Sequence, residues 1–135
     1  MHYLLDTNIC IYIIKKKPVS VLERFREIPF GQIGISVITI AELEYGIRKS
    51  SDPEKNLLAL NQFLIPFEIF SFDFAATIEY GKIRSSLELK GTPIGALDTL
   101  IAAHAKSLDL TLVTNNEKEF NRVEGLRIEN WVNPS

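Results

Sequence analysis

The chain alternates short runs of apolar residues with longer stretches in which apolar residues recur at helical spacing. Short apolar runs bounded by turn residues are typical of buried strands, whereas apolar residues three and four apart mark one face of a helix. The short runs predict strands at residues 3–5, 31–36, 67–72, 111–114 and 127–129. The longer stretches predict helices at residues 7–17, 21–28, 37–49, 53–64, 74–90 and 96–108, with a helical turn near Phe120. This alternation indicates an α/β fold with a mainly parallel sheet.

Turn-forming residues separate the predicted elements. Pro18 breaks the first helical stretch because proline cannot donate the helical hydrogen bond. Residues 50–53, Ser-Ser-Asp-Pro, stop one helix and begin the next with Asp52 as its cap. Asp73 is placed to cap the helix after the 67–72 strand. Because there is no repeat, low-complexity tract or linker, we expect one domain spanning residues 1–135.

Composition limits the classes of protein to which the chain can belong. With 46% hydrophobic and 24% charged residues, the chain has enough apolar surface for a compact globular core. The formal net charge of −2 gives no general attraction to nucleic acid, so a local patch or a metal must hold any polyanion. Cys10 is the only cysteine, which excludes an internal disulfide and a multi-thiolate zinc site and suits a reducing cytoplasm.

No segment has the pattern of a membrane span or an export signal. The apolar stretch at residues 3–14 is too short to span and contains Asp6 and Asn8. Its basic residues follow it, whereas those of an export signal come first. We therefore expect a cytoplasmic protein with no membrane partner.

Three carboxylates stand out by their positions. Asp6 directly follows the first strand, at the sheet edge where open α/β proteins bind ligands, although capping the next helix would equally explain it. Glu42 has no cation three or four residues away, which leaves a long-range ion pair as its structural alternative. Asp98 also lacks a nearby cation, and its structural alternative is to cap the helix that follows. Glu44 is the internal comparison, since Arg48 four residues later predicts an ordinary surface ion pair.

A further group of oxygen donors follows the strand at residues 111–114. Asn115 and Asn116 offer amide oxygens, and Glu119 is a fourth acid, although it is also explained as a solvated side chain. If the acids meet, their mutual repulsion requires a cation among them. Oxygen ligands without His or Cys favour Mg²⁺ or Mn²⁺, which supply a water nucleophile for phosphodiester hydrolysis.

Other chemistries fit the chain poorly. His104 is six residues from Asp98, on another face of the helix and among alanines, which predicts a packed core histidine. The chain has neither a Walker A loop nor a Gly-x-Ser-x-Gly elbow. Asn8 stands where an aspartyl-phosphate motif needs its second acid, which argues against covalent catalysis on Asp6. The lysines at residues 15–17 complement a helix C-terminus and are also placed to touch phosphate.

Four successive segments resemble the motifs of the PIN-domain ribonucleases of the VapC toxin family. They are Leu-Leu-Asp-Thr-Asn-Ile at 4–9, Ile-Ser-Val-Ile-Thr-Ile-Ala-Glu-Leu at 35–43, Ala-Leu-Asp-Thr-Leu-Ile-Ala-Ala-His-Ala at 96–105 and Leu-Val-Thr-Asn-Asn at 112–116. Their common order and spacing make the resemblance specific, and it extends from Leu4 to Trp131. The resemblance implies a three-layer α/β/α fold with a mainly parallel sheet of four or five strands.

The same resemblance implies a Mg²⁺- or Mn²⁺-dependent endoribonuclease. Its metal ligands and catalytic residues map onto Asp6, Glu42 and Asp98. This chain has Asn116 where many PIN domains have an aspartate, so a second metal would be held less tightly or through water.

Two further positions belong to this implied site. Glu119 matches an acid that many VapC sequences carry slightly beyond the last motif, and Thr114 lies within that motif. The resemblance implies that Glu119, Thr114 and Asn116 orient the metal ligands and do not bind the metal directly.

The family also implies partners. A VapC protein is the toxin of a type II toxin–antitoxin system, forms a homodimer and is neutralised by a cognate VapB-type antitoxin. An apolar groove among the helices of residues 7–64 would suit the antitoxin's tail, with contacts expected at Ile13, Ile14, Leu57 and Leu60. The RNA substrate of such toxins is a structured RNA chosen by surface shape. The alternative function is a non-catalytic α/β binding domain that keeps an acidic pocket for a metal or a partner.

Overall fold

The computed structural model describes residues 1–134, so the expected domain end at residue 135 lies outside the described residues. One sheet of five parallel strands has the order β3-β2-β1-β4-β5. The strands are β1 Tyr3–Leu5, β2 Ile33–Ser36, β3 Glu68–Phe70, β4 Thr111–Val113 and β5 Ile128–Glu129. The α-helices are α1 Thr7–Lys15, α2 Val19–Arg26, α3 Val37–Arg48, α4 Pro53–Leu64, α5 Phe74–Leu89, α6 Ala96–Leu108 and α7 Glu117–Phe120. The predicted α/β class is confirmed.

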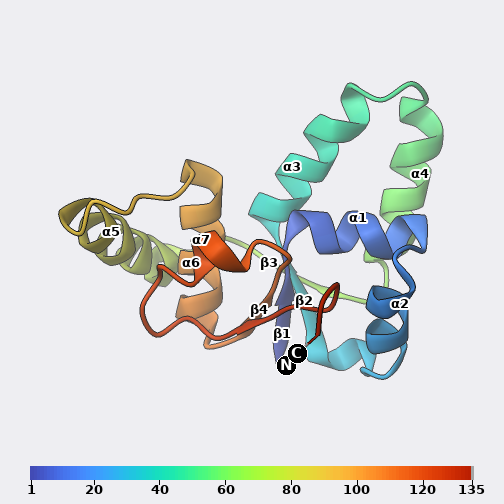
Figure 1. The fold of residues 1–135 in the computed structure, drawn as a ribbon. Helices are drawn as coiled ribbons and strands as arrows, with labels where there is room; N and C mark the ends of the chain where they lie inside the picture. Colours follow the sequence, from blue (N-terminus) through green and yellow to red (C-terminus); the bar gives the residue numbers. More distant parts are fainter. Residues whose placement is uncertain (135) are drawn as a thin grey trace.

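Helices cover both faces of the sheet. Figure 1 shows α1 to α4 on one side and α5 and α6 on the other. Successive residues of a strand point to opposite faces, and β1 follows this rule. Leu5 packs in the hydrophobic cluster of α1 to α4, whereas Leu4 packs in the cluster of α5 and α6. Both leucines are fully buried, which confirms the expected three layers.

The strand order fixes the place of the candidate site. The chain runs outward from β1 through β2 to β3 and returns to the other side of β1 as β4. The point between β1 and β4 is where the order reverses, and ligands of open α/β sheets bind at the carboxyl ends beside such a point. Asp6 follows β1 there, and Thr114 follows β4.

Four strands are shorter than the pattern predicts, and β2 and β3 differ most from it. The strand expected at 31–36 begins at Ile33, because Phe30–Gln32 form a 3₁₀ turn instead. The strand expected at 67–72 is limited to Glu68–Phe70. It lies at the edge of the sheet, where one side of its backbone has no strand to pair with.

The helix ends are governed by individual residues. The first helix ends at Lys15, two residues earlier than expected, because Lys16 takes the left-handed conformation with φ of 60°. Asp52 and Asp73 cap α4 and α5 as predicted, each accepting the backbone N–H three residues ahead. Among the described residues, no helix has the length and apolar character needed to cross a membrane.

Two of the four residues expected in a partner groove belong to the core. Ile13 is 7% exposed and Leu60 is 2% exposed, so neither can contact a partner. Both side chains fill the space between the sheet and the helices that cover it. Ile14 and Leu57 are partly exposed, so contact of these two residues with a partner stays a prediction.

Candidate active site

Asp6 combines the two roles that the sequence left open. Its Oδ1 accepts the backbone N–H of Ile9 at 3.0 Å, so it caps α1, and it is only 7% exposed. Burial raises the pKa of Asp6, hydrogen bonds from Thr114 and Ile9 lower it, and the nearby Glu42 carboxylate raises it. Asp6 is therefore a buried acid with another negative charge beside it.

Glu42 is held by a residue that sequence reasoning missed. The hydroxyl of Thr7, in the first turn of α1, donates to Oε1 of Glu42 at 2.7 Å. Ser36 sets the start of Glu42's own helix by accepting the backbone N–H of Ile38 at 3.0 Å. The signal for Thr7 is its place directly after Asp6, which puts its hydroxyl at the same sheet edge. The proposed long-range ion pair for Glu42 is absent from the described residues.

Asp98 lies inside α6 and does not cap it. The cap position is Gly95, which has no side chain to accept a hydrogen bond, and Asp98 is three residues further on. The hydroxyl of Thr99 donates to the Gly95 carbonyl at 2.8 Å. The capping alternative for Asp98 is therefore wrong, because a cap must stand before the first helical turn.

Electrostatics connect Asp98 to the other acids. Burial, the neighbouring Glu119 and the charges of Glu42 and Asp6 together raise the pKa of Asp98 to about 6, and burial is the largest of these causes. Glu119 therefore lies close enough to Asp98 to disfavour its charged form. The structure thus brings the three predicted ligands and Glu119 into one electrostatic neighbourhood.

The acids form an open cluster. Within residues 1–134, no three His, Cys, Asp or Glu side chains stand close enough to enclose a metal ion. No Lys or Arg in this range forms an ion pair with any of the four acids. Unrelieved repulsion among oxygen-only donors is the setting in which a hard divalent cation binds favourably. The donor set therefore fits Mg²⁺ or Mn²⁺.

The residues after β4 support this cluster. Thr114 is fully buried, bonds the Asp6 carboxylate and accepts the backbone N–H of Asn116 at 2.9 Å. Asn115 is tied elsewhere, since its amide oxygen accepts from Asn130 at 3.2 Å. The Asn116 side chain precedes α7 but makes no capping bond to it. Thr114 thus connects Asp6 to the segment that carries Glu119.

His104 is a packed histidine, as predicted. It is 1% exposed, and its Nε2 donates to the Ser71 carbonyl at 3.1 Å. Nδ1 then accepts from the Ser36 hydroxyl at 2.7 Å. Burial lowers the pKa of His104, consistent with a neutral ring. The ring ties α6 to the start of α3 and so fixes the helices that carry Asp98 and Glu42.

The expected ion pair between Glu44 and Arg48 is wrong. No such pair occurs among the described residues, and Oε1 of Glu44 is buried without a hydrogen-bond partner. The physical reason is that Glu44 turns toward the packed side of α3, whereas Arg48 extends into solvent.

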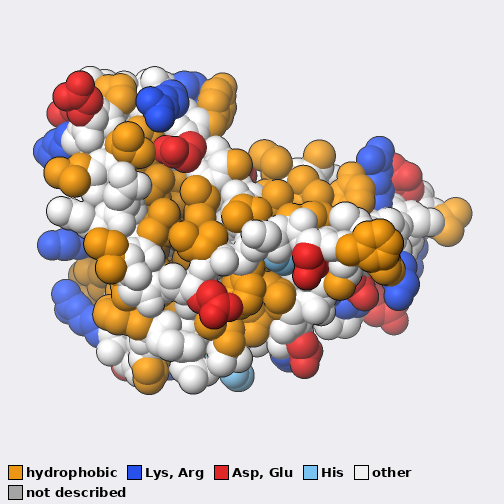
Figure 2. All heavy atoms as spheres, turned by 180° about the vertical axis from the view of Figure 1, so that it is seen from behind, with side chains coloured by type: hydrophobic (Ala, Val, Ile, Leu, Met, Phe, Trp, Pro, Cys, Tyr) orange, Lys and Arg blue, Asp and Glu red, His pale blue; other side chains and the backbone are white. Residues whose placement is uncertain are grey.

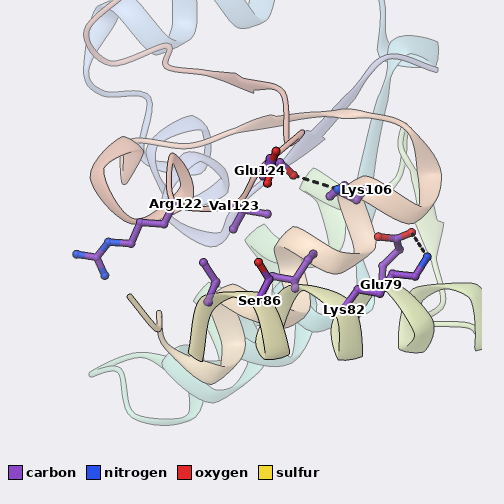
Figure 3. Close-up of a pocket in the computed structure, with 9 residues that line it drawn as sticks. Glu79, Lys82, Ser86, Lys106, Arg122, Val123 and Glu124 are labelled. Carbon is purple, nitrogen blue, oxygen red and sulfur yellow. Dashed lines mark hydrogen bonds and ion pairs between the residues drawn. The ribbon is translucent and has the colours of Figure 1, made fainter. Parts of the chain in front are cut away.

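A cavity of about 220 Å³ lies away from these acids, between α5, α6 and the segment after α7 (Figure 3). Each basic side chain that lines the cavity has a partner within the protein. Lys82 pairs with Glu79, and Lys106 donates to the backbone carbonyl of Glu124 at 3.0 Å. None of the four acids of the cluster lines it, so this cavity is separate from the candidate active site.

Known proteins are similar to this chain over nearly its whole length. The family model described as the PIN domain matches residues 3–126. The tRNA(fMet)-specific endonuclease VapC of Shigella flexneri is 47% identical, over 97% of this chain and 98% of that protein. Ribonuclease VapC2 of Haemophilus influenzae strain Rd is 45% identical, over 98% and 99%. The DNA-bound VapBC complex of Salmonella typhimurium contains a similar chain, with a TM-score of 0.91 and 46% identity over 97% and 98%.

Proposed function

The chain belongs to the PIN-domain family, and from that premise we propose that it is a VapC-type toxin, a metal-dependent endoribonuclease neutralised by a VapB-type antitoxin. The observation that carries the proposal is the acid cluster at the carboxyl edge of the sheet, with Asp98 at a pKa of about 6 and no basic partner among residues 1–134. Without a bound cation, unpaired carboxylates placed this close together would only destabilise the fold.

Asp6, Glu42 and Asp98 would hold the metal. A bound Mg²⁺ or Mn²⁺ neutralises such carboxylates, polarises a phosphate oxygen and makes water a better nucleophile. Thr7 fixes the carboxylate of Glu42 through its 2.7 Å hydrogen bond. Thr114 orients Asp6 in the same way. Positioning contacts of this kind are commonly worth 10- to 100-fold in metal affinity or activity.

Protons compete with a metal at Asp98. Its pKa of about 6 means that it takes up a proton at a higher pH than an ordinary aspartate does. Binding a divalent ion requires ionised ligands, so metal binding is opposed by protonation of Asp98. Asn116 adds no charge to the site, and we expect one tightly held ion and a second held weakly or only with RNA.

We take initiator tRNA, tRNA(fMet), as the substrate to test first. The relative named for cutting it is 47% identical over almost the whole of both chains. Solved VapBC complexes of similar chains support a VapB-type antitoxin as the partner. We place the activity in the cytoplasm, where tRNA is used.

The purified chain should cut a tRNA(fMet) transcript with Mg²⁺ or Mn²⁺ and leave it intact in EDTA. Circular dichroism should be unchanged by EDTA, because the two hydrophobic clusters do not depend on a metal. Cleavage is followed by mapping new RNA ends. Full activity in EDTA would contradict the metal mechanism. If the chain cuts total RNA but not this tRNA, only the choice of tRNA(fMet) as substrate is wrong. If it cuts no RNA, the alternative of a non-catalytic binding domain is favoured.

A homodimer through α5 is part of the proposal. Phe74 and Leu89, at its two ends, are 80% and 86% exposed, and Ile78 lies on the same face. Gly81 and Ser85 between them leave room for close approach of a second helix. Figure 2 shows hydrophobic side chains along this arm of the molecule. Contiguous exposed apolar surface of this kind usually marks an interface.

Ile78→Arg should convert the dimer of the isolated chain to a monomer, as measured by light scattering. A charge in the middle of an apolar helix interface has no partner and must be desolvated. Leu58→Arg is the matched control, because Leu58 is also about half exposed but lies on α4. A wild-type chain that is monomeric, or an unaffected Ile78→Arg dimer, would place this face outside the dimer.

A further inference from the structure

The cations of this chain fall into two groups. Those on and after α5 are mostly neutralised by the protein itself: Lys82, Arg84, Lys90 and Arg127 form ion pairs, and Lys106 and Arg122 bond backbone carbonyls. Those on or beside α1 to α4 mostly form no ion pair within residues 1–134: Lys15, Lys16, Lys17, Arg26, Arg48, Lys49 and Lys55. Two residues are exceptions. Arg24, on α2, does form ion pairs, whereas Lys118, on α7, forms none within residues 1–134. The net charge of −2 hides this asymmetry.

Five of these unpaired cations lie at the far ends of the two helices that begin at the acid cluster: Lys15, Lys16 and Lys17 at the end of α1, and Arg48 and Lys49 at the end of α3. Figure 1 shows α1 and α3 leaving adjacent strand ends in diverging directions. At 1.5 Å per residue, Lys15 is about 13 Å along α1 from Asp6. By the same rise, Arg48 and Lys49 are about 9 to 10 Å along α3 from Glu42. Both basic groups are thus within two or three nucleotides of the acids.

An aromatic side chain stands between the acids and one of these groups. Tyr45 is 65% exposed, three residues after Glu42 and therefore on the same side of α3. Lys49 is four residues further on, with its Nζ 4.5 Å from the Tyr45 ring centre. The outer face of α3 thus presents an acid, an exposed ring and a cation in succession. Exposed rings interleaved with cations are typical of surfaces that bind single-stranded nucleic acid.

Local structure accounts for only part of this charge. Lys15, in the last turn of α1, complements the helix C-terminus, but Lys16 and Lys17 lie beyond that turn. Arg48 has a potential partner in Glu44 but does not pair with it. Figure 2 shows Lys and Arg side chains at the end of the α3–α4 arm and along the outer edge below it.

An RNA substrate needs these cations because the reacting site is acidic. The cluster formed around Asp98 repels phosphate unless a metal is bound, and a single ion does not hold the neighbouring nucleotides. Lysine and arginine supply most phosphate contacts in protein–nucleic acid complexes, and stacking on an aromatic ring adds affinity that does not depend on base identity.

Building on the proposed function, we propose that the RNA strand lies along the outer face of α3, with a base stacked on Tyr45 and its phosphates held by Arg48 and Lys49, while Lys15–Lys17 hold the strand on the other side of the acids. This surface is a substrate-binding site separate from the metal ligands. It acts on RNA affinity and leaves the chemistry of the acids unchanged.

The test measures the affinity for tRNA(fMet) in EDTA, where no cleavage occurs, at several salt concentrations. Each lost phosphate contact makes the slope of log affinity against log salt less steep by about 0.7 to 0.9. We therefore expect a change of about 1.4 to 1.8 for the double variant R48Q/K49Q and for K15Q/K17Q. Tyr45→Ala should lower affinity at least about fivefold with the slope unchanged, because stacking involves no counterion release, and Tyr45→Phe should restore it.

The matched control is the double variant K106Q/R127Q, which removes two charges near the opposite edge of the sheet. It should keep the wild-type slope. The proposal is overturned if the control lowers the slope as much as the two test pairs, or if the test pairs leave it unchanged. A wild-type chain that binds no RNA in EDTA and cuts none with Mn²⁺ would defeat the proposed function as well, whereas normal binding with unaltered variant slopes defeats only this inference.

Discussion

Asp98→Asn should reduce RNA cleavage by more than about a hundredfold, because removing a metal ligand costs more than removing one of its supporting contacts. Asparagine has nearly the same shape, and Asp98 is not the cap of α6, so the helix should form normally. The loss therefore reflects the missing charge. It is measured as the initial rate of tRNA cleavage with saturating Mn²⁺.

The same substitution should stabilise the protein when no metal is present. The pKa of Asp98 in the fold, about 6, is above its ordinary value of 3.8, so folding is disfavoured where the group must be charged. The stability associated with this group is fully present below about pH 4 and is lost as the pH rises through about 6. Since Asp98 is partly exposed, the effect at pH 7 is about 1 kcal/mol after solvent screening, or roughly 3 to 5 °C in Tm.

Asp109→Asn provides the matched control at the other end of α6. Asp109 is exposed and pairs with Arg127, so the same chemical change should leave cleavage and Tm nearly unaltered. Thermal melting in EDTA shows whether Asp98 serves the fold or the reaction. A variant that melts well below the wild type, or that cuts RNA at the wild-type rate, would show that Asp98 serves the fold and not the reaction.

Mn²⁺ affinity should weaken about tenfold for each pH unit below about 6, and should change little above pH 7. The cause is the proton that Asp98 binds below its pKa of about 6, which one Mn²⁺ ion must displace. The measurement is Mn²⁺ binding by electron paramagnetic resonance between pH 5 and pH 8. Mn²⁺ should bind more tightly than Mg²⁺ throughout, because such oxygen ligands favour it and it tolerates less regular geometry.

Glu119→Gln tests the origin of this pH dependence. The amide removes the neighbouring charge but retains Asp6, Glu42 and Asp98. The pH below which Mn²⁺ affinity falls should therefore be lower in the variant, since Glu119 raises the pKa of Asp98. An Mn²⁺ affinity that does not change down to pH 5, or the same pH dependence in Glu119→Gln as in the wild type, would contradict the raised pKa of Asp98 as its cause.

Local pattern was sufficient for the class of fold, and it also selected the acids that we propose as metal ligands. Apolar runs such as β1 are buried on both faces in parallel sheets, so their sequence is recognisable without neighbours. Caps such as Asp52 and Asp73 act on backbone groups three residues away and are equally local. Asp6 follows a strand, and this order in the chain places it at the ligand-binding edge.

Only the tertiary structure decided which side chains meet. Thr7 and Glu42 are 35 residues apart and bond because α1 and α3 start at adjacent strand ends. Glu119 raises the pKa of Asp98 only because the fold brings α7 and the first turn of α6 close together. Contacts between distant segments depend on sheet order and helix packing, which hydrophobic periodicity does not encode.

The same reason explains the errors of the sequence-based predictions. Glu44 and Arg48 have ideal spacing for a pair, but packing of α3 turns the glutamate away from the arginine. Ile13 resembles a groove residue in a helical pattern, yet it is covered by the rest of the core. Helical spacing determines which residues share a face, and the neighbouring elements determine whether that face is buried, paired or open to a partner.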